Sequence, residues 1–290
     1  MPTEHEGDAI YAPGYSEEER RRLIEQAGFF GGFTERLLVD AGIGPGMRVL
    51  DVGCGVGDVS LLVASLVRPE GAVLGVDSDP LALGHARERV SAIGLTNVDF
   101  VEGDIRDLAF DEPFGAAVGR LVLMYLADPA DTLRRIASLL RPGGIIAFQE
   151  LTLTESGLTY PGAPLLQRTG ILINETFRRA GTEMGLKLYP ASIAAGLPAP
   201  AMRAERPIGG GPDFPGYRWM AQITRSILPL MEQLGVANAE DIDVETLHER
   251  LRDEVAGSGG VVAMPTLIRA WARKPTESRE TKRREARSRG

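Results

Sequence analysis

The sequence predicts an α/β protein whose core is a mostly parallel β-sheet covered by helices on both faces. Between Met47 and Glu150, short runs rich in β-branched residues alternate with segments of helical length, a pattern typical of parallel sheets. Two Asp-Pro pairs in this region, at Asp79 and Asp128, each combine a favourable N-cap with a proline in the first helical turn. These pairs mark where two of the covering helices begin.

The first predicted element is a helix near the N-terminus. Residues 1–46 contain a polar arm followed by SEEERRRLIEQAGFFGGFTERLLVDAG, in which Ser16 and Glu19 have the spacing of a capping box. We therefore expect this helix to begin directly after Ser16.

Five strands are predicted between residues 47 and 150. In order, their sequences are RVLDVG, AVLGVD, VDFVEGD, GAAVGRLVL and GIIAFQE. Helix-length segments such as PLALGHARERVSAIG and PADTLRRIASLL separate several of them. This alternation favours a doubly wound sheet.

The pattern changes after Glu150. Three helical segments follow, APLLQRTGILINETFRRAGTEMG, YRWMAQITRSILPLMEQLG and DVETLHERLRDEVAG, joined by Gly- and Pro-rich stretches. Residues 202–208 and 266–273 are candidates for an antiparallel pair of strands added to the sheet. Residues 275–290 have no apolar periodicity and are predicted to be disordered.

Composition narrows the class of protein. The 290 residues are 43% hydrophobic and 25% charged, enough to bury a full core. No apolar run approaches the roughly 20 residues of a membrane helix, and the N-terminus lacks a secretion signal. With Cys54 as its only cysteine, the chain is expected to be cytoplasmic. The net charge of −8 favours a small-molecule partner over nucleic acid or an acidic membrane surface.

A glycine-rich loop follows the first strand, in VLDVGCGVGDVS. Its glycines are Gly53, Gly55 and Gly57, and Asp58 stands where a dinucleotide fingerprint has its third glycine. Asp51 and Asp58 add negative charge at a place where a pyrophosphate would bind. The loop therefore suits a ligand that ends in a zwitterion, such as S-adenosylmethionine, better than a dinucleotide.

Two acidic residues at the ends of later strands fit an adenosine. Asp77 ends the second strand, where a carboxylate can accept hydrogen bonds from both hydroxyls of a ribose. Asp104 follows the third strand, where it can accept from the exocyclic amine of adenine while Ile105 packs near the ring.

On these motifs, residues 47–150 resemble the core of class I S-adenosylmethionine-dependent methyltransferases, in particular the ubiquinone/menaquinone-biosynthesis-type branch that acts on small molecules. The resemblance implies a Rossmann-like, seven-stranded sheet with the last strand antiparallel. It also implies a set of cofactor-binding residues, which are Asp51, Gly53, Gly55, Gly57, Asp77, Ser78, Gly103, Asp104 and Ile105.

The chain departs from one pattern of the wider class. Enzymes that methylate nucleic acid bases often carry an Asp/Asn-Pro-Pro-aromatic run after the fourth strand, and this sequence has GRLVLMYL there. With the acidic net charge, this argues against a nucleic acid substrate.

The resemblance suggests four parts in the chain. Residues 1–46 form an arm and helix over the cofactor, 47–150 the cofactor-binding core, 151–274 a helical lid with the final strands, and 275–290 a basic tail. Residue Tyr15 in the arm is either a cofactor lid or ordinary packing.

Three further residues extend the cofactor site. Tyr11 and Gln26 are additional candidates on the arm. Arg120 is expected near the sulfonium or the methionine carboxylate, because ligands of open α/β sheets sit at the carboxyl ends of strands, with a surface salt bridge as the alternative.

Methyl transfer mainly requires alignment and exclusion of water, but an acceptor that loses a proton would benefit from a base. Glu150, at the end of the fifth strand, is the first candidate, and Glu175 is the second. Either could be a structural carboxylate. No His and carboxylate spacing suggests a metal site, so none is predicted.

The helices after Leu151 are expected to roof the pocket and bind a largely apolar acceptor. The candidates to line it are Tyr125, Tyr160, Phe177, Tyr217, Trp219 and Met220. A nucleotide-dependent oxidoreductase and a non-catalytic S-adenosylmethionine-binding protein remain alternatives, and a homo-oligomer stays open.

Overall fold

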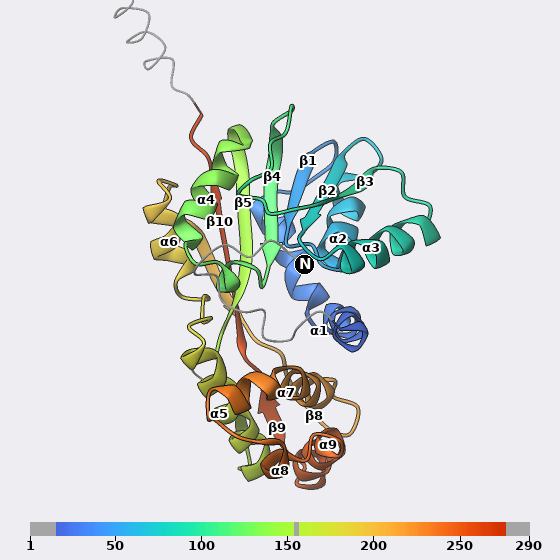
Figure 1. The fold of residues 1–290 in the computed structure, drawn as a ribbon, viewed down its shortest axis with the longest axis vertical. Helices are drawn as coiled ribbons and strands as arrows, with labels where there is room; N and C mark the ends of the chain where they lie inside the picture. Colours follow the sequence, from blue (N-terminus) through green and yellow to red (C-terminus); the bar gives the residue numbers. More distant parts are fainter. Residues whose placement is uncertain (1–15, 154–156, 277–290) are drawn as a thin grey trace, which may run out of the picture.

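A seven-stranded sheet forms the centre of the computed structural model, which describes residues 16–153 and 157–276 (Figure 1). Its order is β3-β2-β1-β4-β5-β10-β7. The strands are β1 (Arg48–Val52), β2 (Ala72–Asp77), β3 (Val98–Glu102), β4 (Phe114–Arg120), β5 (Leu140–Thr152), β7 (Ala201–Glu205) and β10 (Thr266–Arg273). All neighbours from β3 to β5 are parallel, and β10 runs antiparallel to both β5 and β7. The predicted fold class, including its antiparallel last strand, is confirmed.

Helices cover both faces of this sheet because its strands are apolar on both sides. On one face α1 (Glu17–Ala41), α2 (Asp58–Val67) and α3 (Pro80–Ala92) pack with strand residues such as Val49 and Val118. On the other, α4 (Pro129–Ser138) and α6 (Leu188–Ala194) pack with Leu50 and Phe148. Successive strand residues point to opposite faces, so each strand contributes to both cores.

A second region, which we call the lid, lies at the lower end of Figure 1. It consists of α5 (Pro164–Arg179), α7 (Gly216–Gln233), α8 (Ala239–Ile242), α9 (Leu247–Gly257) and a small antiparallel sheet, in the order β6-β9-β8. Its strands are β6 (Leu158–Tyr160), β8 (Ile208–Gly210) and β9 (Val261–Ala263). The lid shares one apolar core with the α4 face of the main sheet. The boundaries at residues 46, 150 and 274 stay a prediction. Strands β7 and β10 lie beyond residue 150 and join the same sheet as the strands before it.

Side-chain caps begin three helices where the sequence predicts. The Ser16 hydroxyl accepts the Glu19 N–H at 3.1 Å. The carboxylates of Asp79 and Asp128 cap α3 and α4, each followed by proline. The Glu19 side chain does not complete the capping box, because its carboxylate is engaged by Arg22.

One strand is shorter than its apolar run suggests. The sequence predicts a strand through GAAVGRLVL, but β4 ends at Arg120, because Leu121 has a left-handed backbone with φ of 55°. The chain then forms a short 3-10 helix, η1 (Leu123–Tyr125). Leu121 therefore redirects the chain at the end of the strand.

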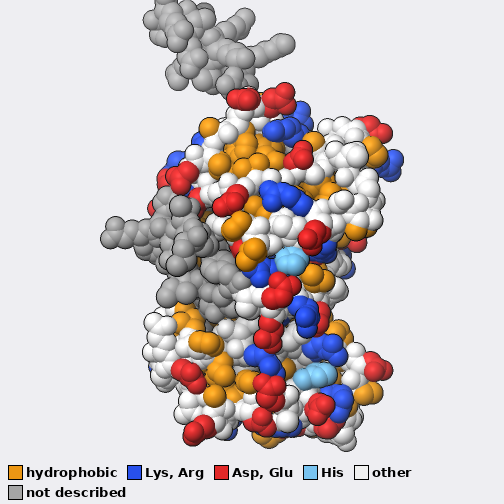
Figure 2. All heavy atoms as spheres, turned by 45° about the vertical axis from the view of Figure 1, so that its right-hand side comes forward, with side chains coloured by type: hydrophobic (Ala, Val, Ile, Leu, Met, Phe, Trp, Pro, Cys, Tyr) orange, Lys and Arg blue, Asp and Glu red, His pale blue; other side chains and the backbone are white. Residues whose placement is uncertain are grey.

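Charges of both signs share the face shown in Figure 2, where acidic and basic side chains intersperse over the sheet region and the lid. Among residues 16–153 and 157–276, no helix has both the length and the apolar character needed to cross a membrane.

Candidate active site

A cavity of about 260 Å³ opens between the sheet and the lid. Its walls come from α1, the ends of β1, β2 and β4, the segments that follow β1 to β4, and the lid helices α5 and α7. A second cavity, lined by residues that include Leu133 and Phe148, measures only about 10 Å³. The large cavity is therefore the candidate site, and its position at the carboxyl ends of parallel strands agrees with the general rule for open α/β sheets.

The glycine loop forms the floor of one half of this cavity. Gly53, Gly55 and Gly57 all have positive φ values, of 63°, 52° and 83°. At Gly55, the nearest described atom to an added Cβ would be Leu23 Cδ1, 3.9 Å away. The space beside the Gly55 Cα is therefore part of the cavity, and a ligand can approach the Gly55 backbone closely.

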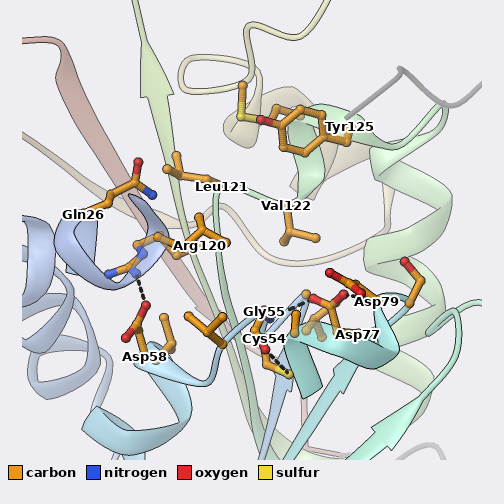
Figure 3. A pocket seen from close by; sticks show the side chains of 18 of the residues that line it. Gln26, Cys54, Gly55, Asp58, Asp77, Asp79, Arg120, Leu121, Val122 and Tyr125 are labelled. Atoms are coloured by element: carbon orange, nitrogen blue, oxygen red, sulfur yellow. Dashed lines mark hydrogen bonds and ion pairs between the residues drawn. The ribbon is translucent and has the colours of Figure 1, made fainter. Parts of the chain in front are cut away.

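Asp77 joins the glycine loop to the end of β2 (Figure 3). One carboxylate oxygen accepts the Gly55 N–H at 2.8 Å, and the other accepts the Asp79 N–H at 2.9 Å. Each oxygen keeps a further lone pair for a ligand hydroxyl. Burial raises the pKa of Asp77 above its usual range, and backbone hydrogen bonding from Asp79, Gly55 and Ser78 opposes that rise. Asp77 is thus held in position to accept from a ribose.

The expected adenine side also lines the cavity, with Ser78, Gly103, Asp104 and Ile105. The Asp104 carboxylate is engaged by Arg106, with Oδ1 2.8 Å from Nε and Oδ2 2.5 Å from Nη2. Sequence reasoning missed Arg106, although it lies two residues from a predicted site residue.

Arg120 and Asp58 lie together at the opposite side of the loop (Figure 3). The Arg120 side chain is only 7% exposed, donates to the Thr34 hydroxyl at 3.2 Å and lies 3.9 Å from an Asp58 oxygen. The other Asp58 oxygen is 2.7 Å from Arg89 Nη1. Two guanidinium groups therefore compensate the acid that replaces the third glycine. Arg120 lines the cavity, and its ion pair with Asp58 is buried and not at the surface.

Asp51 is placed differently from the prediction. It lies beneath the loop and outside the cavity lining, with one oxygen accepting from the Ser60 hydroxyl at 2.6 Å. Burial raises its pKa to about 7, and hydrogen bonding to Ser60 opposes the rise. The pleat explains the difference, because Asp51 points to the same side of β1 as Val49, toward the covering helices.

Glu150 is fully buried and also lies outside the cavity lining. One carboxyl oxygen accepts the backbone N–H groups of Val122 and Leu123, at 3.1 and 2.8 Å. No described residue hydrogen-bonds the other oxygen. Burial raises the pKa of Glu150 to about 8, and its two backbone donors oppose the rise. Its geometry fits a residue that holds the segment after β4, which forms a wall of the cavity, better than a base that contacts the acceptor.

Glu150→Gln is expected to flatten the pH dependence of folding stability. Since the folded-state pKa of about 8 exceeds the ordinary 4.5, the folded protein keeps a proton that the unfolded chain releases. That stabilisation is complete below about pH 4.5 and declines as the pH rises through about 8. Glutamine resembles the protonated carboxyl group and still accepts both N–H groups. The free energy of unfolding, measured with urea, should decrease less between about pH 6 and about pH 8 in the variant than in the wild type.

Glu70→Gln provides the matched control, because Glu70 is exposed. It should reproduce the wild-type profile. If Glu150→Gln also reproduces it, Glu150 is ionised in the folded protein.

Two other predicted residues do not reach the cavity. Glu175 lies on the outer side of α5, 2.7 Å from Arg178 and from Arg179, and hydrogen bonds to these residues lower its pKa to about 2. Ile173 and Phe177, two positions away on either side, line the cavity instead. Tyr160 is 80% exposed on β6.

The remaining lid candidates divide into two groups. Tyr125, Phe177 and Trp219 line the cavity, whereas Tyr217 and Met220 are buried outside its lining. Tyr15 and Tyr11 lie outside the described residues. Among those described, no cluster of three or more His, Cys, Asp or Glu side chains could hold a metal.

The sequence predicts that the N-terminal helix covers the cofactor, but Gln26 is the only cavity residue of α1 that it identifies. Glu19, Arg20, Arg22 and Leu23 line the cavity beside the predicted Gln26. Glu19, Arg22 and Gln26 recur at helical spacing and continue toward the buried Phe30. Charged side chains on the apolar stripe of an amphipathic helix were the signal that could have identified them.

The fold and the cavity together define an α/β protein with a ligand site at the carboxyl ends of its parallel strands. Residues 43–174 match the model of a methyltransferase domain. This match supports the resemblance of residues 47–150 to the class I S-adenosylmethionine-dependent methyltransferases, with S-adenosylmethionine as the cofactor. The glycine loop and Asp77 fit this cofactor, because they combine open backbone with an oriented carboxylate.

Relatives with known names support this assignment. The chain is 34% identical over 130 residues to the ubiquinone/menaquinone biosynthesis C-methyltransferase UbiE of Ectopseudomonas mendocina, across 44% of this chain and 48% of that protein. The chain spans about half the length of the curated relatives it matches.

Two solved structures show the same fold. A candidate methyltransferase of Bacillus halodurans C-125 has a TM-score of 0.56 at 19% identity, covering 84% of this chain and 99% of that one. The 4+2 cyclase SpnF has a TM-score of 0.51 at 19% identity, covering 95% and 89%.

Proposed function

We propose that the protein transfers a methyl group from S-adenosylmethionine to a small, largely apolar metabolite. The observation that carries this proposal is that one cavity has two unlike halves. One half contains the glycine loop, Asp77 and Arg120, and the other is lined by apolar residues of the segment after β4 and of the lid. The methyl group would pass from the cofactor to the acceptor where these two halves of the cavity meet.

In this proposal, the polar half binds the cofactor. Asp77 accepts hydrogen bonds from the ribose hydroxyls, and Asp104 lies at the adenine. Close approach at Gly55 allows backbone groups to hold the methionine end, and Arg120 supplies a positive charge for its carboxylate. The sulfonium would then face the apolar half.

The acceptor half supplies alignment and exclusion of water. Leu121, Leu151, Phe177, Trp219 and Ile223 are among its lining residues, and they favour a flat or branched apolar body. UbiE is named as a C-methyltransferase of ubiquinone and menaquinone biosynthesis, which supports a quinone-like aromatic acceptor and transfer to carbon.

S-adenosylmethionine supplies an activated methyl group to an in-line nucleophile. The chain itself has to hold the acceptor atom in line with the sulfonium and keep water out. Glu150 contributes indirectly, because it fixes the backbone of Val122 and Leu123 beside the acceptor. The proposal assigns it no proton transfer.

A panel of metabolites including hydroxylated naphthalenes, incubated with the protein and S-adenosylmethionine, tests the proposal. The expected result is a product heavier by one methyl group, detected by mass spectrometry. Thermal stabilisation by S-adenosylhomocysteine and its absence with NAD(P) would exclude the oxidoreductase.

Stabilisation by S-adenosylhomocysteine with no methylated product across the panel would favour the second alternative, a cofactor-binding protein without transfer activity. The fold similarity to the cyclase SpnF makes this outcome a meaningful one to test.

A further inference from the structure

A buried polar cluster connects α1 to the lid helix α7 at the cavity wall. It consists of Glu19, Arg22 and Gln26 on α1, and Trp219 and Ser226 on α7. Arg22 donates from Nε to Glu19 at 2.7 Å and from Nη2 at 2.5 Å, while Ser226 donates to Glu19 at 2.9 Å. Such a buried ion pair holds its members in one arrangement.

The cluster determines which way the Gln26 amide points. Its oxygen accepts from Arg22 Nη1 at 2.7 Å and from Trp219 Nε1 at 3.1 Å. Both partners are nitrogen atoms that can only donate, so the amide oxygen must occupy this position and both of its lone pairs are used. The amide nitrogen is forced to the other side, with two N–H donors.

The Gln26 nitrogen faces the cavity without a partner among the described residues. Gln26 is 6% exposed and lines the cavity, and no described acceptor hydrogen-bonds Nε2. Figure 3 shows the nitrogen directed toward the side of Leu121, with Asp77 and Asp79 across the pocket. A buried N–H donor with a fixed orientation favours a ligand that places a hydrogen-bond-accepting oxygen next to it.

We infer that Gln26 selects methyl acceptors that carry a hydrogen-bond-accepting oxygen, a carbonyl or a deprotonated hydroxyl, on an apolar ring system. This inference rests on the proposed function. The cofactor carboxylate is an alternative acceptor for this donor, but Arg120 already provides a cation at the methionine end. The hydrogen bond from Trp219, a residue of the lid helix α7, places the Gln26 amide at the apolar half.

The inference predicts that the protein distinguishes α-tetralone from tetralin, two bicyclic probes that differ by one ring carbonyl. With S-adenosylhomocysteine saturating, calorimetry should show about 10-fold tighter binding of the ketone by the wild type. Gln26→Glu keeps the size of the side chain and an acceptor for Arg22 and Trp219, but it removes both donors. This variant should bind the two probes equally or prefer tetralin.

Two further variants make the test specific. Gln233→Glu, the same change at an exposed position on α7, should keep the wild-type preference. Trp219→Phe removes one of the two donors that fix the Gln26 oxygen, so that Arg22 alone orients the amide, and it should reduce the preference while Gln26 is still present.

Equal binding of the two probes by the wild-type complex would overturn the inference. It would also be overturned if Gln26→Glu weakened S-adenosylhomocysteine binding but kept the ketone preference, because the donor would then serve the cofactor carboxylate. Failure of the wild type to bind S-adenosylhomocysteine would instead contradict the proposed function, and it is measured before either probe is added.

Discussion

Asp77→Ala is expected to weaken S-adenosylhomocysteine binding by about 1.5–3 kcal/mol, or roughly 10- to 100-fold. The carboxylate supplies charge-assisted hydrogen bonds to the ribose hydroxyls. It also orients the glycine loop, through the Gly55 N–H at 2.8 Å. Removing it therefore affects both ends of the cofactor. Isothermal calorimetry on the folded variant measures the loss directly.

The matched control is Asp99→Ala, since Asp99 is an exposed carboxylate on β3, the strand that pairs with β2. The control should bind S-adenosylhomocysteine like the wild type. Unchanged affinity in Asp77→Ala, with a normal melting temperature, would remove Asp77 from the binding site.

Gly55→Ala is expected to reduce S-adenosylhomocysteine binding by 2 kcal/mol or more, at least about 30-fold. The added Cβ would occupy the space into which the ligand approaches, where Leu23 is the nearest protein contact at 3.9 Å. The φ of 52° also means that alanine strains the backbone, at a cost of about 1–2 kcal/mol in folding stability.

Gly94→Ala separates these two effects. Gly94 has a φ of 70° and no atom within 4 Å of an added Cβ, and it lies after α3, away from the cavity. Both variants should lose similar stability in urea unfolding, and only Gly55→Ala should lose cofactor binding. Retained binding in Gly55→Ala would show that the ligand does not approach this part of the loop.

The core of the fold is predictable because its signals are local and repeated. Alternating strand and helix periods predict the parallel sheet, and Asp79 and Asp128 mark helix starts with side-chain caps that the structure contains. Helix α6 is harder, since LYPASIA is short and contains a proline. The small sheet of the lid has strands of only three residues, too short for a periodic signal.

The predicted site residues fall into two groups, those that the sheet topology brings to the cavity and those whose role depends on the direction of the side chain. Residues of the strand-end loops, such as Asp77 and Arg120, reach the cavity because topology brings all carboxyl ends of parallel strands to one edge. For Glu150 and Glu175 the sequence position is insufficient, because the direction of the side chain decides the role. Glu150 turns to backbone donors inside the protein, and Glu175 turns to arginines on the helix surface.

The position of β10 has a consequence for how the protein is made. Thr266–Arg273 follow every other strand in the sequence, yet they pair on one side with β5 and on the other with β7. During synthesis, β7 therefore leaves the ribosome with no neighbour in the main sheet, and β5 has an open edge. An exposed edge strand is a site for pairing with other chains. Until residue 273 has left the ribosome, that edge of β5 stays open to pairing with other chains.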